Sequence, residues 1–138
     1  MLKALAKGLA LTFKTLFRPR ITLRYPEEKK VMYERWRGCP YLVAGEDGRE
    51  LCVGCGICAK GCPAQAIQVT AGKREDNTRY PATFELDLGR CIFCGFCAQS
   101  CPKGAIKMGH DYELATEDKK SLLLTRDDLL RHRDKEKA

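Results

Sequence analysis

The chain has 138 residues, 31% of them charged and 44% hydrophobic, and a formal net charge of +7 at pH 7. This length predicts one domain with extensions. Nine cysteines are an odd number and nothing in the sequence suggests secretion, so a disulfide framework is disfavoured. Residues 1–37, the N-terminal arm, hold ten Lys or Arg and three Glu, whereas the two signs balance in residues 38–138. The whole excess of positive charge therefore lies in the arm.

The start of the arm predicts an amphipathic helix. At 100° per residue its large hydrophobic side chains fall on one stripe with a basic strip beside it, and Pro19 ends the pattern. The stripe comprises Leu2, Leu5, Leu9, Phe13 and Leu16, and the basic strip comprises Lys3, Lys7, Lys14 and Arg18. This pattern is typical of a helix that lies in a membrane interface, with its lysines at the phosphates. The helix is too short and too charged to span a bilayer.

The sequence of the arm has three alternative interpretations. A helix packed into a protein groove, without lipid contact, stays open. A cleaved signal peptide is disfavoured, because Lys14 interrupts the apolar stretch and no small-residue cleavage site follows. Nucleic-acid binding is also disfavoured, since the basic residues lie on an apolar helix and no nucleic-acid-binding motif accompanies them.

Eight of the nine cysteines form two copies of the pattern C-x2-C-x2-C-x3-C-P, 39 positions apart. In the bacterial-type ferredoxin pattern, three thiolates of each run hold one cubane cluster and the fourth reaches across to the other cluster. One 4Fe–4S cluster is therefore assigned to Cys52, Cys55, Cys58 and Cys101, and a second to Cys91, Cys94, Cys97 and Cys62. These residues predict an electron carrier with two 4Fe–4S clusters.

The repeat predicts an α+β fold for residues 38–110, a ferredoxin-like pseudo-twofold arrangement of two βαβ units. Gly54, Gly56 and Gly95 are expected to give the cysteine loops their backbone freedom. Ile67 and Ile106 are expected on the helix that follows each run, facing the core between the clusters. Because so short a domain buries little hydrophobic surface, the clusters are expected to form part of its core.

Zinc is the main alternative cofactor, since zinc sites also use CxxC pairs. A triple cysteine run has one thiolate too many for half of a zinc site, and the trailing Cys-Pro has no role there. The pattern thus favours iron–sulfur clusters. Cys39 lies outside both runs and is predicted to be a small buried residue.

Residues 111–138 are predicted as a C-terminal extension with a helical end. Thr125 and Asp128 resemble a capping box that opens a short helix. The leucines of this segment are expected to cover the flank of the core or to face another subunit; they are Leu122, Leu123, Leu124, Leu129 and Leu130.

Over essentially its full length the chain resembles the eight-iron ferredoxin subunit (subunit I) of NADH–quinone oxidoreductase, respiratory complex I. The resemblance rests on FRPRITLRYPEEK at 17–29, RGCPYL at 37–42, and the cysteine-bearing stretches 46–67 and 85–106. It implies a relay subunit without a substrate site, whose two clusters pass electrons from the NADH and flavin side toward quinone. It also implies a hetero-oligomer with other iron–sulfur subunits and the quinone-site subunit, peripheral on the cytoplasmic face of the inner membrane.

Two other functions belong to similar proteins. One is the ferredoxin subunit of a membrane-bound nickel–iron hydrogenase or formate hydrogenlyase, and the other is a free ferredoxin with two 4Fe–4S clusters. The complete arm and the late DLL at 128–130 favour complex I over the hydrogenase. The concentration of basic residues in the arm argues against a free soluble carrier.

Overall fold

The computed structural model describes residues 2–45 and 48–135, with side chains described as far as residue 131. The chain divides into two compact units, Met1–Val31 and Met32–Ala138. The first contains helix α1 (Leu2–Leu16), and the second contains the strands and the other helices. Residues 136–138 of the predicted C-terminal extension lie outside the described residues.

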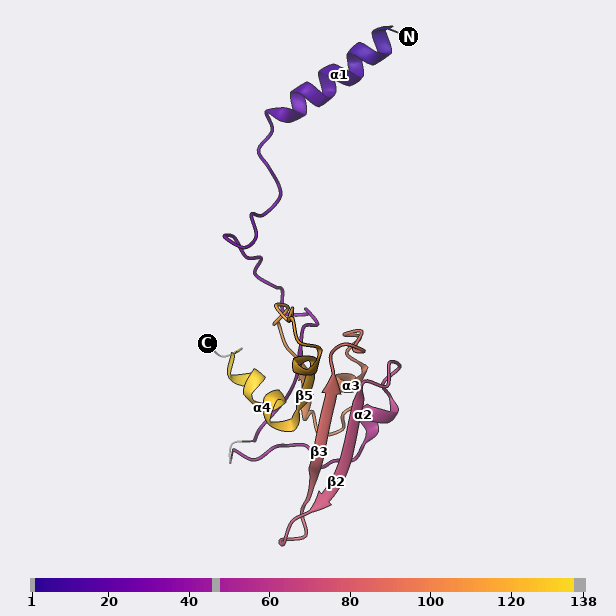
Figure 1. Cartoon of the computed structure of the whole chain (residues 1–138), viewed down its shortest axis with the longest axis vertical. Helices are drawn as coiled ribbons and strands as arrows, with labels where there is room; N and C mark the ends of the chain where they lie inside the picture. The colour runs from indigo at the N-terminus through magenta and orange to yellow at the C-terminus, as the bar shows by residue number, and fades with distance from the viewer. Residues whose placement is uncertain (1, 46–47, 136–138) are drawn as a thin grey trace. The chain divides into compact units, whose positions relative to one another are not determined.

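Helix α1 forms where the sequence predicts it, and all of its residues are exposed (Figure 1). The Thr12 and Thr15 hydroxyls donate to backbone carbonyls one turn back, at Leu9 and Leu11, both at 2.9 Å. A helix of this length is marginal in water without packing partners. The predicted apolar stripe is exposed along the helix. None of the described helices is long and apolar enough to cross a membrane.

The second unit is a small mixed α/β domain in which the order strand, short helix, strand occurs twice. The first set is β1 (Pro40–Leu42), α2 (Ile57–Lys60) and β2 (Ile67–Lys73), and the second is β3 (Arg79–Asp87), α3 (Phe96–Gln99) and β4 (Ile106–Met108). Strand β1 pairs antiparallel with β4, and β2 pairs antiparallel with β3. The β2–β3 pair is the longest in the domain (Figure 1).

Strands β2 and β3 bury one face of their pair. Ile67 lies opposite Leu86 and Val69 lies opposite Phe84, so the buried side chains alternate along each strand. Ile67 and Ile106 are both buried, as expected, but the helical placement was wrong, because they begin β2 and β4. The helices end before the Cys-Pro steps, and the β-branched isoleucines that follow suit extended strands.

The C-terminal segment joins the domain through η1 (Lys119–Leu122), β5 (Leu123–Thr125) and α4 (Arg126–Lys135). Strand β5 extends the sheet beside β3. The predicted cap forms, since the Thr125 backbone N–H and Oγ1 donate to Asp128 Oδ2 at 3.1 and 2.6 Å. Leu124 and Leu129 are buried in the core, whereas Leu123 is 49% exposed. The extension therefore covers the domain's own core with two of its leucines.

The core is small and adjoins the cysteine runs. Its largest fully buried hydrophobic side chains are Phe84, Leu42, Leu86 and Leu129. Full burial of such a side chain contributes about 1.5–3 kcal/mol. The buried thiols of Cys58 and Cys97 pack in the same cluster of residues. A group bound by these cysteines would therefore lie in contact with the hydrophobic core.

Candidate metal centres

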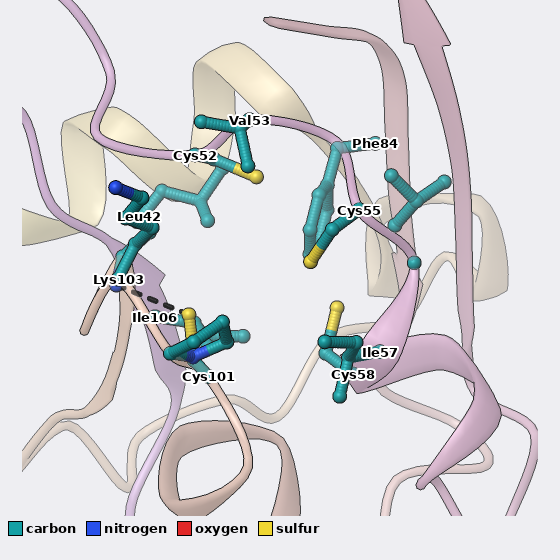
Figure 2. Close-up of a pocket in the computed structure, with 14 residues that line it drawn as sticks. Leu42, Cys52, Val53, Cys55, Ile57, Cys58, Phe84, Cys101, Lys103 and Ile106 are labelled. Carbon is teal, nitrogen blue, oxygen red and sulfur yellow. Dashed lines mark hydrogen bonds between the residues drawn. The ribbon is translucent and has the colours of Figure 1, made fainter. Parts of the chain in front are cut away.

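The first cavity is lined by three thiols of the first cysteine run and by one from the second. Figure 2 shows the sulfurs of Cys52, Cys55, Cys58 and Cys101 pointing into one space from separate sides. The open volume is about 390 Å³. Its remaining wall is largely apolar and includes Leu42, Val69, Phe84 and Ile106. Four thiols around an apolar cavity form a donor set suited to a soft metal or an iron–sulfur cluster.

The second cavity repeats this arrangement with the runs exchanged. It is lined by Cys91, Cys94 and Cys97 from the second run and by Cys62 from the first, around about 360 Å³. Its apolar wall includes Ile67, Leu86, Ile92 and Met108. The structure thus gathers the eight cysteines into the same two groups of four that the sequence pattern assigns.

In the first cavity the thiols surround a space and do not converge on one point (Figure 2). Among the residues that the structure describes, no three His, Cys, Asp or Glu side chains are grouped as ligands of one metal ion. A single zinc ion takes four ligands, with thiolate sulfurs at about 2.3 Å. The wider arrangement fits a group that presents several metal corners, as a cubane does.

The loops that carry the thiols adopt left-handed backbone at matching positions. Gly56 and Gly95 have φ of 74° and 76° and precede α2 and α3. Gly54 has φ of 64°, and Phe93, its equivalent in the second run, has φ of 52°. Sequence reasoning found the glycines but missed Phe93, because a bulky residue is rare in this conformation. The repeat alignment was the signal that would have placed it.

Backbone amides donate to several of the cysteine sulfurs. The Gly54 N–H bonds Cys52 Sγ at 3.5 Å, Ala66 N–H bonds Cys62 Sγ at 3.4 Å, and Ala105 N–H bonds Cys101 Sγ at 3.3 Å. The last two lie at equivalent repeat positions. Such bonds stabilise negative charge on sulfur and tune reduction potential. The sequence does not identify these donors, because the donating group is the backbone N–H and the side chain does not reveal which amide faces a sulfur.

Burial acts against ionisation of several thiols. It raises the pKa of Cys58 and of Cys97 to about 11, and it also raises the pKa of Cys52 and of Cys91. Neighbouring cysteines add to the effect by charge repulsion, and backbone hydrogen bonds oppose it. Thiolates here would need a positive partner, and bound iron would supply one, with release of protons.

Arg74 and Arg37 make contacts beside the cysteine runs, whereas Cys39 lies outside both cavities. Arg74 donates to Glu50 at 2.7 Å and joins the β2–β3 connection to the chain just before Cys52. The Arg37 guanidinium donates to the backbone carbonyl of Cys94. Cys39 is buried, as predicted. Its backbone N–H donates to the Asp111 carbonyl, and its carbonyl accepts from the Gly109 N–H. It lines neither of the two cysteine cavities.

Residues 51–105 match the family model of the 4Fe–4S dicluster domain. Three curated relatives are similar over most of the chain. NADH-quinone oxidoreductase subunit I 2 of Rhizobium meliloti (strain 1021) is 47% identical, over 91% of this chain and 68% of the relative. NADH-quinone oxidoreductase subunit I of Syntrophotalea carbinolica is 44% identical, over 87% of this chain and 68% of the relative. Subunit I 2 of Geobacter sulfurreducens is 43% identical, over 93% of this chain and 73% of the relative.

A solved structure is also similar. It is a chain of the membrane-bound sulfane sulfur reductase, an archaeal respiratory membrane complex, with a TM-score of 0.58 and 33% identity. The match covers 78% of this chain and 53% of that one, so the present chain spans about half of its length. Together with the relatives and the matched domain, this assigns the chain to a family: it belongs to the NADH-quinone oxidoreductase subunit I family and contains a 4Fe–4S dicluster domain.

Proposed function

We propose that the chain is an electron-relay subunit of NADH–quinone oxidoreductase and holds two 4Fe–4S clusters, one in each cavity. The observation that supports this most is the division of eight motif cysteines into two four-thiol cavities. One cluster would be held by Cys52, Cys55, Cys58 and Cys101, and the other by Cys91, Cys94, Cys97 and Cys62. Iron–sulfur clusters supply one-electron transfer when bound. The chain would have no substrate site of its own.

The chain's own residues would fix where the clusters lie and how much water reaches them. Each run contributes to both cavities, so the short segment from Cys58 to Cys62 joins the two sites and holds them at a set separation. The apolar walls, which include Phe84 and Leu86, exclude water from the sulfurs. The amide donors at Ala66 and Ala105 stabilise charge on the crossing thiolates. The proposed arrangement is a pseudo-twofold pair of one-electron sites.

The proposed direction of transfer is from the NADH and flavin side toward the quinone site. The partners would be the other iron–sulfur subunits and the quinone-site subunit, on the cytoplasmic face of the membrane. The names of the curated relatives support a place in NADH-quinone oxidoreductase. The family resemblance, and not a contact within this chain, supplies the direction.

Helix α1 is proposed to dock at the membrane surface beside those partners. Its hydrophobic stripe is exposed along its length, and Lys3, Lys7 and Lys14 lie beside it. An exposed apolar stripe flanked by lysines suits acyl chains next to anionic headgroups. Packing into a protein groove alone is the other outcome that an experiment must separate.

The function is tested by solubilising native membranes in mild detergent and separating the complexes on a native gel. We expect mass spectrometry to find the chain with flavin- and quinone-site subunits, and NADH to reduce its clusters in that band. Co-migration with a nickel–iron subunit would move the function to a hydrogenase. Recovery alone in the soluble fraction would indicate a free ferredoxin, and zinc without acid-labile sulfide would contradict both clusters.

A further inference from the structure

Arg37 places a positive charge on the loop that lines the second cavity. It lies three residues before β1, and its Nη1 donates to the backbone carbonyl of Cys94, 57 positions along the chain. The side chain also lies against Gly95, where an added Cβ would stand 3.3 Å from both Cδ and Nε of Arg37. Cys94 and Gly95 both line the second cavity. One hydrogen bond therefore holds the guanidinium on this loop, and its side chain lies close to Gly95.

Among the residues that the structure describes, none is recorded in a matching arrangement on the triple-cysteine loop of the first cavity. Gly56 is the repeat equivalent of Gly95, and among the described residues nothing lies within 4 Å of a Cβ built there. The first cavity does have a cation in its wall, Lys103, but this residue comes from the Cys101 segment (Figure 2). The two clusters would thus sit in different charge environments despite their matching ligand loops.

A cation at this place favours the reduced form of a nearby cluster. Reduction adds one electron and so one negative charge to the cluster, whereas the guanidinium keeps its charge and transfers no proton. Coulomb attraction is then stronger after reduction than before it. The hydrogen bond also offsets the partial negative charge of the Cys94 carbonyl beside the cluster. Because Arg37 is exposed, water and salt weaken both effects.

We propose that Arg37 raises the reduction potential of the second cluster selectively and so sets part of the difference between the two clusters. Arg37 acts through the charge that its hydrogen bond holds beside the Cys94 loop, and it is not a ligand. The inference rests on the proposed function, since it requires a cluster in each cavity. It predicts a difference in reduction potential between the two clusters that their identical cysteine motifs do not explain.

The test is an EPR-monitored redox titration of both clusters in the intact complex. Arg37→Gln removes the charge but keeps an N–H donor, and Arg37→Met removes both with a side chain of similar length. Arg37→Lys keeps the charge. Arg79→Gln is the matched control, because Arg79 is exposed at the start of β3 and lines neither cavity. Cys94→Ser and Cys55→Ser identify which signal belongs to which cavity.

We expect Arg37→Gln and Arg37→Met to shift the reduction equilibrium of the second cluster about three- to tenfold toward the oxidised form. A tenfold shift is about 59 mV for a one-electron couple. The first cluster should shift much less, Arg37→Lys should keep most of the wild-type potential, and Arg79→Gln should change neither. If only one uncharged variant assembles, that variant decides the outcome.

The inference is overturned if the uncharged variants leave the second potential unchanged, or shift both clusters equally. It is also overturned if Arg37→Lys shifts the potential as far as Arg37→Gln, since geometry and not charge would then be responsible. A wild-type complex without two cluster signals from this chain would instead contradict the proposed function. The two failures are therefore distinguishable.

Discussion

At the scale of single residues, the two repeats share a backbone that their side chains only partly reveal. Three equivalent positions have positive φ in both copies: Gly54 and Phe93, Gly56 and Gly95, Gln65 and Gly104. Glycine adopts this conformation without a steric penalty, whereas other residues are strained in it. The glycines were predictable from the sequence. Phe93 and Gln65 carry no such signal in their own side chains, and only their alignment with Gly54 and Gly104 in the repeat points to this conformation.

A first prediction compares two glycines of similar conformation. Gly104→Ala should cost about 1–2 kcal/mol, the strain of a left-handed alanine, because nothing lies within 4 Å of its added Cβ. Gly54→Ala should cost more, because its Cβ would meet backbone atoms of Tyr80, Ala71 and Pro81 at 3.0–3.2 Å. Thermal unfolding of the cluster-loaded chain measures the difference. An equal loss in both variants would show that the β2–β3 contact at Gly54 yields easily.

The cysteine groups were predictable from the sequence, whereas the hydrogen bonds around them were not. The cysteine spacing predicted which thiols meet, because the ligands of a cluster follow a fixed pattern. The bond from Arg37 to the Cys94 carbonyl joins positions far apart in the chain. The amides of Ala66 and Ala105 act through the backbone. Neither kind of contact leaves a motif in the order of side chains.

At the scale of elements, the two terminal segments use hydrophobic residues differently. Helix α4 follows β5 directly, and β5 is fixed beside β3, so Leu129 is held over the core and is 0% exposed. Helix α1 is followed by an extended stretch with no such strand pairing in the described residues, and its leucines are exposed. The sequence predicted both helices. It left open what the C-terminal leucines cover, since charge patterning does not specify a packing partner.

A second prediction concerns two leucines of the C-terminal segment. Leu129→Ala should destabilise the domain by about 2–5 kcal/mol, because it removes a fully buried side chain and leaves a cavity. Leu123→Ala is the control, since the same substitution at a half-exposed position should cost much less. Urea unfolding of the cluster-loaded chain gives both values. Similar losses would mean that α4 does not stabilise the core.

A third prediction tests the hydrophobic stripe of α1. Leu9→Glu places a charge in the stripe, whereas Leu11→Glu makes the same change outside it, and both leucines are exposed in this chain. Loss of one leucine contact with an apolar partner is worth about 1.5–3 kcal/mol. Leu9→Glu should therefore weaken association with the membrane complex roughly ten- to hundredfold, with both clusters intact. Sedimentation of washed membranes measures the bound fraction.

The stripe is not a docking surface if the two glutamate variants are released equally or if neither is released. Binding of a peptide of residues 2–18 to anionic vesicles separates lipid from protein contact. Binding that weakens with salt supports the lipid surface, because lysines at phosphates are screened. If the peptide does not bind the vesicles, α1 is assigned to a protein groove.

At the scale of the whole molecule, neither cysteine run makes a cavity alone. The first cavity needs Cys101 and the second needs Cys62, so each site forms only when both repeats are folded together. Antiparallel pairing of β1 with β4 and of β2 with β3 joins the repeats. The cysteine pattern predicted this crossing. It did not predict the length of β2 and β3 or the third strand β5, which pairs with the end of β3.

The central claim is that each of two clusters is held by both runs, and EPR of the NADH-reduced complex with Cys62→Ser tests it most directly. Cys55→Ser and Cys94→Ser define the signals of the first and second cavities, because each lines only one of them. We predict that Cys62→Ser disturbs the signal that Cys94→Ser disturbs and leaves the other in place. Loss of the Cys55 signal instead would contradict the crossed arrangement and the relay built on it.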